Sequence, residues 1–228
     1  MFGNVMHPNE AGPDAQDRLL DAAERLFAEH GFHGVSLRTI TTEAGVNLAA
    51  ANYYFRSKEG LFRAVFERRV GPVNADREAL LQELMARSAG RPAVGEVLRA
   101  FLEPAFRAST SPGAEMFRKL SGRSSVDPSP EVRRIVYELY DPVSSRFVDA
   151  FKRACPDLSR EDLFWRLACV FGAMMYVRAD SGRLQRLLGD DLNMSDPEAA
   201  IAHLIPFLTA GMEVPPITTR DENEGEST

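Results

Sequence analysis

The side chains best suited to specific hydrogen bonding with another molecule gather in one short stretch near the N-terminus. Asn52 carries an amide that can donate and accept at the same time, as an asparagine does when it pairs with the edge of adenine. Arg38 can reach a guanine edge or a phosphate. Tyr53, Tyr54 and Lys58 are suited to phosphate oxygens, which fix register rather than sequence. These residue types predict contacts with a nucleic acid.

Two short amphipathic helices joined at a glycine would position these side chains. Ser36 and Asn47 are expected to cap the two helices, because their side-chain oxygens can accept hydrogen bonds from first-turn amides. Gly45 ends the first helix where the backbone favours positive φ. Apolar residues recur at helical spacing and are Leu37, Ile40 and Ala44 in the first helix and Ala51 and Phe55 in the second. This is the pattern of a helix-turn-helix, whose second helix enters the major groove.

The outward face of the second helix remains once its apolar residues are buried. Its alanines would allow close approach, and an alanine methyl can meet a thymine methyl. The predicted DNA-binding residues are Ser36, Arg38, Asn47, Leu48, Ala49, Ala50, Asn52, Tyr53, Tyr54 and Lys58. Small three-helix clusters also dock proteins, so spacing alone leaves protein docking as an alternative.

Residues 17–69 resemble the N-terminal domain of TetR-type transcriptional regulators. The segments that carry the resemblance are AAERLFAEHGF and AGVNLAAANYYFRSKEGLFRAVF. The matching positions of the second helix and its flanks are Gly45, Val46, Asn47, Tyr53, Phe55, Ser57, Lys58 and Glu59. The family usually has an aromatic residue where this chain has Asn52, and Thr or Ser where it has Ala50. The resemblance implies DNA binding and leaves the operator sequence open.

Composition and charge agree with a globular DNA-binding protein. The 228 residues are 44% hydrophobic and 26% charged, with a formal net charge of −6. Residues 36–70 nevertheless hold six basic and three acidic side chains. A basic stretch on an acidic protein suits docking to DNA through one face.

Cysteine usage and hydropathy predict a cytoplasmic location. Cys155 and Cys169 lack metal-type spacing and suit small buried thiols in a reducing compartment. A redox switch between them is the alternative, although nothing near either marks it as reactive. The chain has neither an apolar run of the ~18 residues that a membrane span needs nor the layout of a secretion signal. No membrane association is expected.

Helical periodicity continues to the end of the chain and predicts an all-α fold. We expect a flexible arm over 1–13, an N-terminal three-helix helix-turn-helix domain over 14–60, a larger helical ligand-binding and dimerisation domain over 61–212, and a disordered acidic tail over 213–228. Gly71 and Pro72 predict a break between two helices at the joint of the domains. A loop is expected over 121–130.

The segment from 159 to 178 carries apolar residues on nearly every side. Such a helix is buried from more than one direction, here by the core and by a second subunit. Paired with the last helix, 197–212, it predicts a four-helix homodimer interface of Phe164, Leu167, Phe171, Met175, Ile201, Leu204, Ile205 and Leu208. A single monomer core covering both helices is the alternative.

Aromatic and methionine residues of the second domain are typical of both a helical core and a ligand cavity. The family resemblance implies a small effector there. NLAAANYYFRSKEGLFRAVF, DLFWRLACVFGAMM and LIPFLTAGM resemble the branch that senses long-chain fatty acids or their CoA esters. The predicted ligand residues are Phe62, Phe66, Phe101, Phe106, Phe117, Arg118, Tyr140, Phe147, Phe171, Met174 and Arg178, with Arg118 or Arg178 meeting a carboxylate.

The residue types argue against an enzyme. The sequence has no Gly-rich phosphate loop, no serine-elbow motif and no metal-ligand spacing, and none of its four histidines lies in a catalytic arrangement. We expect no catalytic residues, no cofactor and no metal. The sequence predicts a homodimer that binds pseudo-palindromic double-stranded operator DNA and is released by a small apolar effector. The alternatives are a scaffolding dimer that docks protein, or a regulator without an effector.

Overall fold

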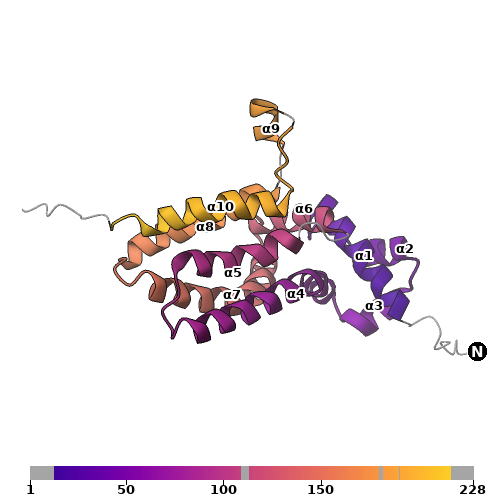
Figure 1. Cartoon of the computed structure of the whole chain (residues 1–228). Helices are drawn as coiled ribbons and strands as arrows, with labels where there is room; N and C mark the ends of the chain where they lie inside the picture. The colour runs from indigo at the N-terminus through magenta and orange to yellow at the C-terminus, as the bar shows by residue number, and fades with distance from the viewer. Residues whose placement is uncertain (1–12, 109–112, 180–181, 190, 217–228) are drawn as a thin grey trace, which may run out of the picture.

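A computed structural model of the chain describes residues 13–108, 113–179, 182–189 and 191–216. Within those ranges every regular element is a helix (Figure 1), which confirms the predicted all-α fold. The helices are α1 Pro13–His30, α2 Leu37–Ala44, α3 Leu48–Phe55, α4 Lys58–Arg87, α5 Val94–Arg107, α6 Ala114–Ser125, α7 Pro130–Ala154, α8 Arg160–Ala179, α9 Arg183–Leu188 and α10 Pro197–Glu213. The predicted arm, apart from residue 13, and most of the predicted tail lie outside the described residues.

Helices α1, α2 and α3 form a cluster at one end of the molecule (Figure 1). The caps that the sequence predicted are present. Ser36 Oγ accepts from the Thr39 amide at 3.0 Å, and Asn47 Oδ1 accepts from the Ala50 amide at 2.7 Å. Gly45 has φ 62°, in the left-handed region that glycine favours. Local chemistry therefore sets the angle between α2 and α3.

Helix α4 leads out of this cluster and runs through the second domain without a break (Figure 1). The predicted break at Gly71 and Pro72 is wrong. A proline inside a helix removes one hydrogen bond, here the bond to the carbonyl of Arg68, and bends the helix without having to end it. Both residues are on the exposed side of α4, where the proline ring meets no other helix. One continuous helix of 30 residues thus serves both domains.

A buried carboxylate fixes α1 to α4. Glu24 is 3% exposed, yet it accepts from Arg68 NH2 at 2.5 Å and from Arg69 Nε at 2.9 Å. Two guanidinium groups around one carboxylate supply the hydrogen bonds that a buried charge requires. The cluster of α1, α2 and α3 is therefore held to α4 by charge as well as by apolar packing.

Two side chains of α4 hold the neighbouring helices of the second domain. Asn74 Nδ2 donates to the carbonyl of Leu139 on α7 at 3.0 Å, and Arg77 Nε donates to that of Phe101 on α5 at 2.8 Å. Each carbonyl lies three residues before a proline, Pro142 and Pro104 respectively. A proline distorts the preceding turn and frees its carbonyls for outside donors.

The apolar interior divides into two cores. The first joins α1, α2, α3 and the first half of α4 with Phe117 and Leu120 of α6 and Val132 and Ile135 of α7. The second is formed by the rest of α4 with α5, α7, α8 and α10. Helices α6 and α7 extend into the predicted loop at 121–130, leaving residues 126–129 between them. The second domain thereby completes the core of the first.

The structure corrects part of the predicted dimer interface. Leu167, Ile201, Ile205 and Leu208 lie in the second core, where α10 packs along α5 and α8. Met175 and Leu204 are half-buried against the same core. Of the predicted residues, Phe164 and Phe171 remain exposed. Periodicity selected largely the inner faces of α8 and α10, because both faces of these helices carry apolar side chains.

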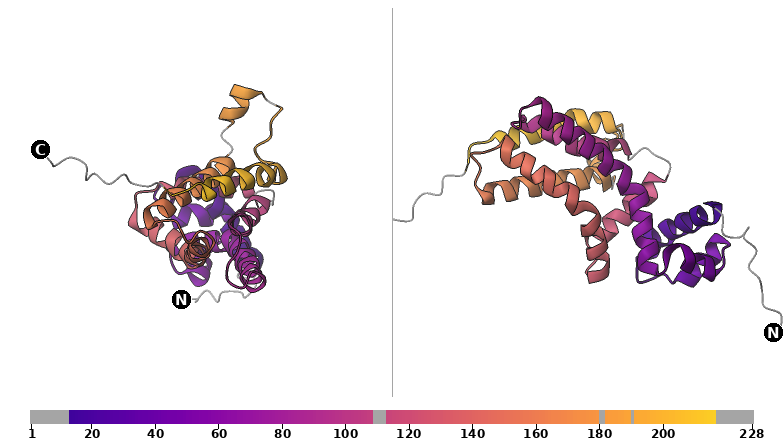
Figure 2. Two further views of the ribbon diagram at one scale, coloured as in Figure 1. Left: turned by 60° about the vertical axis from the view of Figure 1, so that its left-hand side comes forward. Right: turned by 90° about the horizontal axis from the view of Figure 1, so that it is seen from below.

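Helix α9, which the sequence analysis did not predict, projects away from the helical body (Figure 1 and the left view of Figure 2). Its leucines Leu184, Leu187 and Leu188 are exposed. Within the described ranges, no helix is both long and apolar enough to cross a bilayer.

The Glu24 cluster gives a first prediction. Replacing Glu24 with Gln removes the buried anion that Arg68 and Arg69 share and leaves Arg68 only its pair with the exposed Asp21, so we expect the free energy of unfolding to fall by about 3 kcal/mol. Urea denaturation measures this change. Asp14→Asn, which removes the exposed pair with Arg18 on the same helix, should cost less than about 1 kcal/mol. Equal effects of the two substitutions would contradict a structural role for the buried carboxylate.

Candidate functional site

The outer face of α3 carries Leu48, Ala49, Asn52 and Tyr53. These positions lie within one side of a helix with 3.6 residues per turn, opposite the buried Ala51 and Phe55. Asn52 is exposed and Tyr53 is 78% exposed, so both side chains are available to another molecule. An amide and a phenol beside small apolar groups can read base edges and contact phosphates.

Ala50 does not belong to this outer face, contrary to the prediction. Its side chain is 6% exposed and lies with Ala51 on the inner side of α3. The predicted methyl contact with thymine therefore falls to Ala49, which is exposed. Ser36 and Asn47 are exposed at the starts of α2 and α3, where their side-chain oxygens serve as caps.

Tyr54 and Arg38 occupy the two sides of the outer face. Tyr54 is half-buried against the first core, and its ring meets that of Tyr53 edge-on with centroids 5.3 Å apart. It therefore also supports the orientation of Tyr53. Arg38 is exposed on α2.

Lys58 has a structural role that the sequence did not indicate. Its ammonium donates to the carbonyls of Phe32 at 3.1 Å and Val35 at 3.2 Å, and it lies 4.3 Å from the centroid of the Phe32 ring. Lys58 thus ties the start of α4 to the connection between α1 and α2. Two of its three donors are engaged in the free protein, and the predicted phosphate contact stays a prediction.

Arg56 is a residue that the sequence analysis missed. It ends α3 with φ 64°, an uncommon conformation for a residue other than glycine, and its amide donates to the carbonyl of Asn52 at 3.0 Å. Its side chain is exposed and has no ion-pair partner in the described part of the chain. An exposed cation at the end of the outer face is suited to a phosphate.

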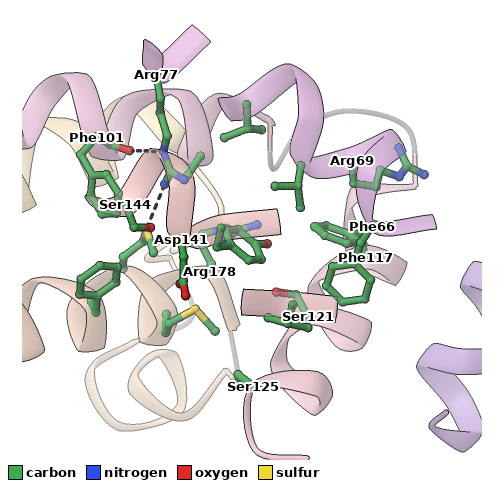
Figure 3. A pocket seen from close by; sticks show the side chains of 18 of the residues that line it. Phe66, Arg69, Arg77, Phe101, Phe117, Ser121, Ser125, Asp141, Ser144 and Arg178 are labelled. Carbon is green, nitrogen blue, oxygen red and sulfur yellow. Dashed lines mark hydrogen bonds between the residues drawn. The ribbon is translucent and has the colours of Figure 1, made fainter. Parts of the chain in front are cut away.

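A cavity of about 300 Å³ lies between α4, α5, α6, α7 and α8 (Figure 3). Its apolar wall consists of Phe66, Val70, Val73, Phe101, Ala105, Phe117, Val136, Phe171, Met174 and Met175. Its polar lining consists of Arg69, Arg77, Ser121, Ser125, Tyr137, Tyr140, Asp141, Ser144 and Arg178. A mainly apolar lining with a few polar groups is typical of a site for a small amphipathic molecule.

Seven of the eleven predicted ligand residues line this cavity, namely Phe66, Phe101, Phe117, Tyr140, Phe171, Met174 and Arg178. The other four do not. Phe62 meets the rings of Phe27 and Phe32 edge-on in the first core, and Phe147 packs against Phe101. Phe106 and Arg118 line a much smaller cleft near the start of α10. Periodicity cannot separate a wall residue from a core residue on the same helix.

Arg77 is a cavity residue that no sequence signal predicted. It is 3% exposed, lies 4.3 Å from the centroid of the Phe101 ring, and places NH2 3.7 Å from Met174 Sδ (Figure 3). Burial lowers the pKa of Arg77 to about 10. An arginine on a long helix is ordinarily exposed, so its burial depends on neighbours that are distant in sequence.

Arg178 adds a second cation to the same lining. Burial lowers the pKa of Arg178, and Arg118 acts in the same direction. Its Nε is buried and has no hydrogen-bond partner among the described residues. Burial also raises the pKa of Tyr140, so this phenol stays neutral beside the guanidinium. The cavity therefore combines an apolar wall with positive charge.

Two family sequence models match the chain. The model described as bacterial regulatory proteins, tetR family, matches residues 19–65, and the model described as tetracyclin repressor-like, C-terminal domain, matches residues 99–211. The HTH-type transcriptional repressor BdcR of Escherichia coli is 32% identical over 143 residues, which are 62% of this chain and 68% of BdcR.

Solved structures of similar fold include two fatty-acid regulators. The fatty acid degradation regulator FadR from Bacillus halodurans superposes with a TM-score of 0.60 at 18% identity, over 89% of this chain and 97% of that one. FadR from Bacillus subtilis in complex with stearoyl-CoA gives a TM-score of 0.55 at 14% identity, over 86% and 98%. At these identities the likeness concerns the fold.

The cap of α3 gives a second prediction. Asn47→Ala removes the acceptor of the Ala50 amide and should lower the free energy of unfolding by about 1 kcal/mol. Amide hydrogen exchange should quicken in the first turn of α3, because that turn frays. Thr42→Ala, an exposed substitution within α2, should stay within about 0.5 kcal/mol. Unchanged exchange in α3 would contradict the role of the cap.

Proposed function

This chain belongs to the TetR family of bacterial regulatory proteins, and from that premise we propose that it is a cytoplasmic homodimeric repressor that leaves a pseudo-palindromic operator when a small effector binds. TetR-family proteins are non-enzymatic DNA-binding transcriptional regulators, and the family models match both domains of this chain. The observation that carries the proposal is the pairing of an exposed polar face on α3 with a cavity beside α4, the helix that follows α3.

The outer face of α3 supports base reading by one residue and anchoring by others. Asn52 lies at its centre and carries the amide that pairs bidentately with adenine. Tyr53 and Arg56 flank it and reach for the phosphates, which fix register. In a two-fold dimer the two α3 helices enter successive major grooves about 34 Å apart, so the operator repeats with inverted symmetry.

The outer faces of α8 and α10 support the dimer. Phe164 and Trp165 are each 62% exposed, and Phe207 of α10 is 73% exposed. Small exposed residues separate these aromatic side chains, among them Ala168, Cys169 and Gly172 on α8 and Ala202, Ala210 and Gly211 on α10. Aromatic residues beside small ones let two such helix pairs interdigitate. A second copy would bury this face and also cover Cys169, which the sequence analysis expected to be buried.

The cavity favours an effector-binding role for the second domain over a role in dimerisation alone. Its apolar wall agrees with the fatty acid or acyl-CoA class that the sequence resemblance implies, and the similar Bacillus subtilis FadR structure contains stearoyl-CoA. Phe66 and Phe117 line the cavity and also belong to the first core, where the centroids of their rings are 5.3 Å apart. A ligand that displaces either ring therefore displaces the DNA-binding domain.

The effector acts by shifting the population of two dimer states. Occupancy favours a state in which the two α3 helices have the wrong separation for the operator. To move a 1:99 equilibrium to 99:1, the effector must favour that state by about 5.5 kcal/mol. Contacts that form in only one state supply this difference.

The DNA-reading role of Asn52 gives a third prediction. Asn52→Ala should cost about 1–3 kcal/mol of operator affinity, concentrated at a few base pairs, because one bidentate contact is lost. Arg56→Gln should weaken all sequences alike and reduce the salt dependence by about one phosphate contact. Fluorescence anisotropy with a panel of single-base operator variants measures both. A uniform loss from Asn52→Ala would contradict base reading by this residue.

The exposed aromatic face gives a fourth prediction. The double substitution Trp165→Ser and Phe207→Ser should shift the dimer toward monomer, because it removes the large apolar groups at the centre of the interface. Sedimentation velocity over a range of protein concentrations measures the equilibrium. Val126→Ser alters an equally exposed apolar residue away from this face and should leave the dimer intact. A dimer unaffected by the double substitution would place the interface elsewhere.

A further inference from the structure

We propose that the cavity binds a compact amphipathic carboxylic acid as its free anion, held by Arg178 and Arg77, and that it does not bind the CoA ester. The inference rests on the proposed ligand-responsive function and names the chemical class of its effector. It depends on two properties of the cavity, its unpaired positive charge and its size.

Arg178 has a buried donor, its Nε, and no described residue accepts from it. A buried donor without an acceptor is costly, and a cation in that position more so. Arg77 is only weakly satisfied at its far end, where Nη1 donates to Asn74 Oδ1 at 3.4 Å and Nη2 meets the sulfur of Met174, a weak acceptor. An anion placed between the two guanidinium groups would satisfy both.

The other charged groups of the lining do not supply that anion. Arg69 is engaged with Glu24 and points away from the centre of the cavity (Figure 3). Asp141 is exposed, so water solvates its carboxylate. Arg118 lies outside the cavity and adds further positive charge near Arg178. The remaining polar lining is neutral hydroxyl groups.

The volume of the cavity limits the length of its ligand. A volume of about 300 Å³ holds roughly ten non-hydrogen atoms, if each takes about the 30 Å³ that a water occupies in the liquid. A medium-chain acid such as octanoate has this size. A CoA ester is neutral at its thioester carbonyl, and its anionic phosphates are separated from the acyl chain by the long uncharged pantetheine arm. An acyl chain that fills a cavity of this size would therefore place a neutral carbonyl, and not an anion, beside the two guanidinium groups.

The two arginines belong to helices with different tasks. Arg178 is on α8, whose outer face is the proposed dimer surface, and Arg77 is on α4, which continues into the DNA-binding domain. A carboxylate that binds both would draw α4 toward α8. It would also compete with the hydrogen bond from Arg77 to the carbonyl of Phe101. The same contact thus binds the acid and transmits its presence.

The first test compares two ligands on the unaltered protein by isothermal titration calorimetry. Octanoate and octanamide have nearly the same shape and differ in charge. We expect octanoate to bind at least tenfold more tightly. Equal affinities would overturn the proposal, as would tighter binding of octanoyl-CoA than of octanoate. This comparison needs no variant, so it does not depend on whether a substitution impairs folding.

The second test assigns the contact to a residue. Arg178→Gln should weaken octanoate binding at least tenfold and leave octanamide binding nearly unchanged. The matched control is Arg118→Gln, which removes a nearby cation that does not line the cavity and should change octanoate affinity less than about twofold. Equal losses from the two substitutions would overturn the role of Arg178.

Operator binding, measured with and without octanoate, separates this proposal from the function on which it rests. Octanoate that binds selectively without changing operator affinity would support the cavity chemistry and contradict the ligand-responsive repressor. Loss of operator affinity on adding octanoate supports both. A protein that binds no duplex at all, yet prefers octanoate to octanamide, would contradict only the proposed function.

Discussion

The structure depends on α4 being one continuous helix that belongs to two cores. The buried carboxylate of Glu24 holds Arg68 and Arg69 of α4 against α1, which fixes the DNA-binding domain to the first half of the helix. Asn74 and Arg77 hold the second half against α7 and α5. Because α4 continues past Pro72 as one helix, a change beside Arg77 reaches α3 through few intermediate contacts.

The cavity lies beside the part of this helix that carries the buried Arg77. Burying the charge of an arginine costs free energy, and burying two arginines in one cavity lining costs more. Arg77 avoids part of that cost by donating to a carbonyl near Pro104 and by lying over the ring of Phe101. Arg178 has no comparable partner among the described residues. The resulting excess of positive charge gives the cavity its preference for an anion.

How much could be predicted from the sequence depended on the range of the interaction. The caps at Ser36 and Asn47 and the turn at Gly45 are local and were predicted correctly, as was the all-α fold. The burial of Arg77 and the engagement of Lys58 with the α1–α2 connection depend on residues far away in the chain, so no pattern indicated them. The likeness to the family implied an effector site in the second domain, but not which aromatic side chains line the cavity there.

The central claim is that occupancy of the cavity changes the distance between the two α3 helices of the dimer. Double electron–electron resonance between spin labels reports on that distance. One label replaces Thr42 on α2 of each subunit, which packs against α3, and Cys155 and Cys169 are replaced by serine. The account predicts that octanoate shifts the main distance in the free dimer, and that operator DNA restores the original one. A distance distribution that octanoate leaves unchanged, at concentrations where calorimetry shows the cavity to be filled, would contradict it.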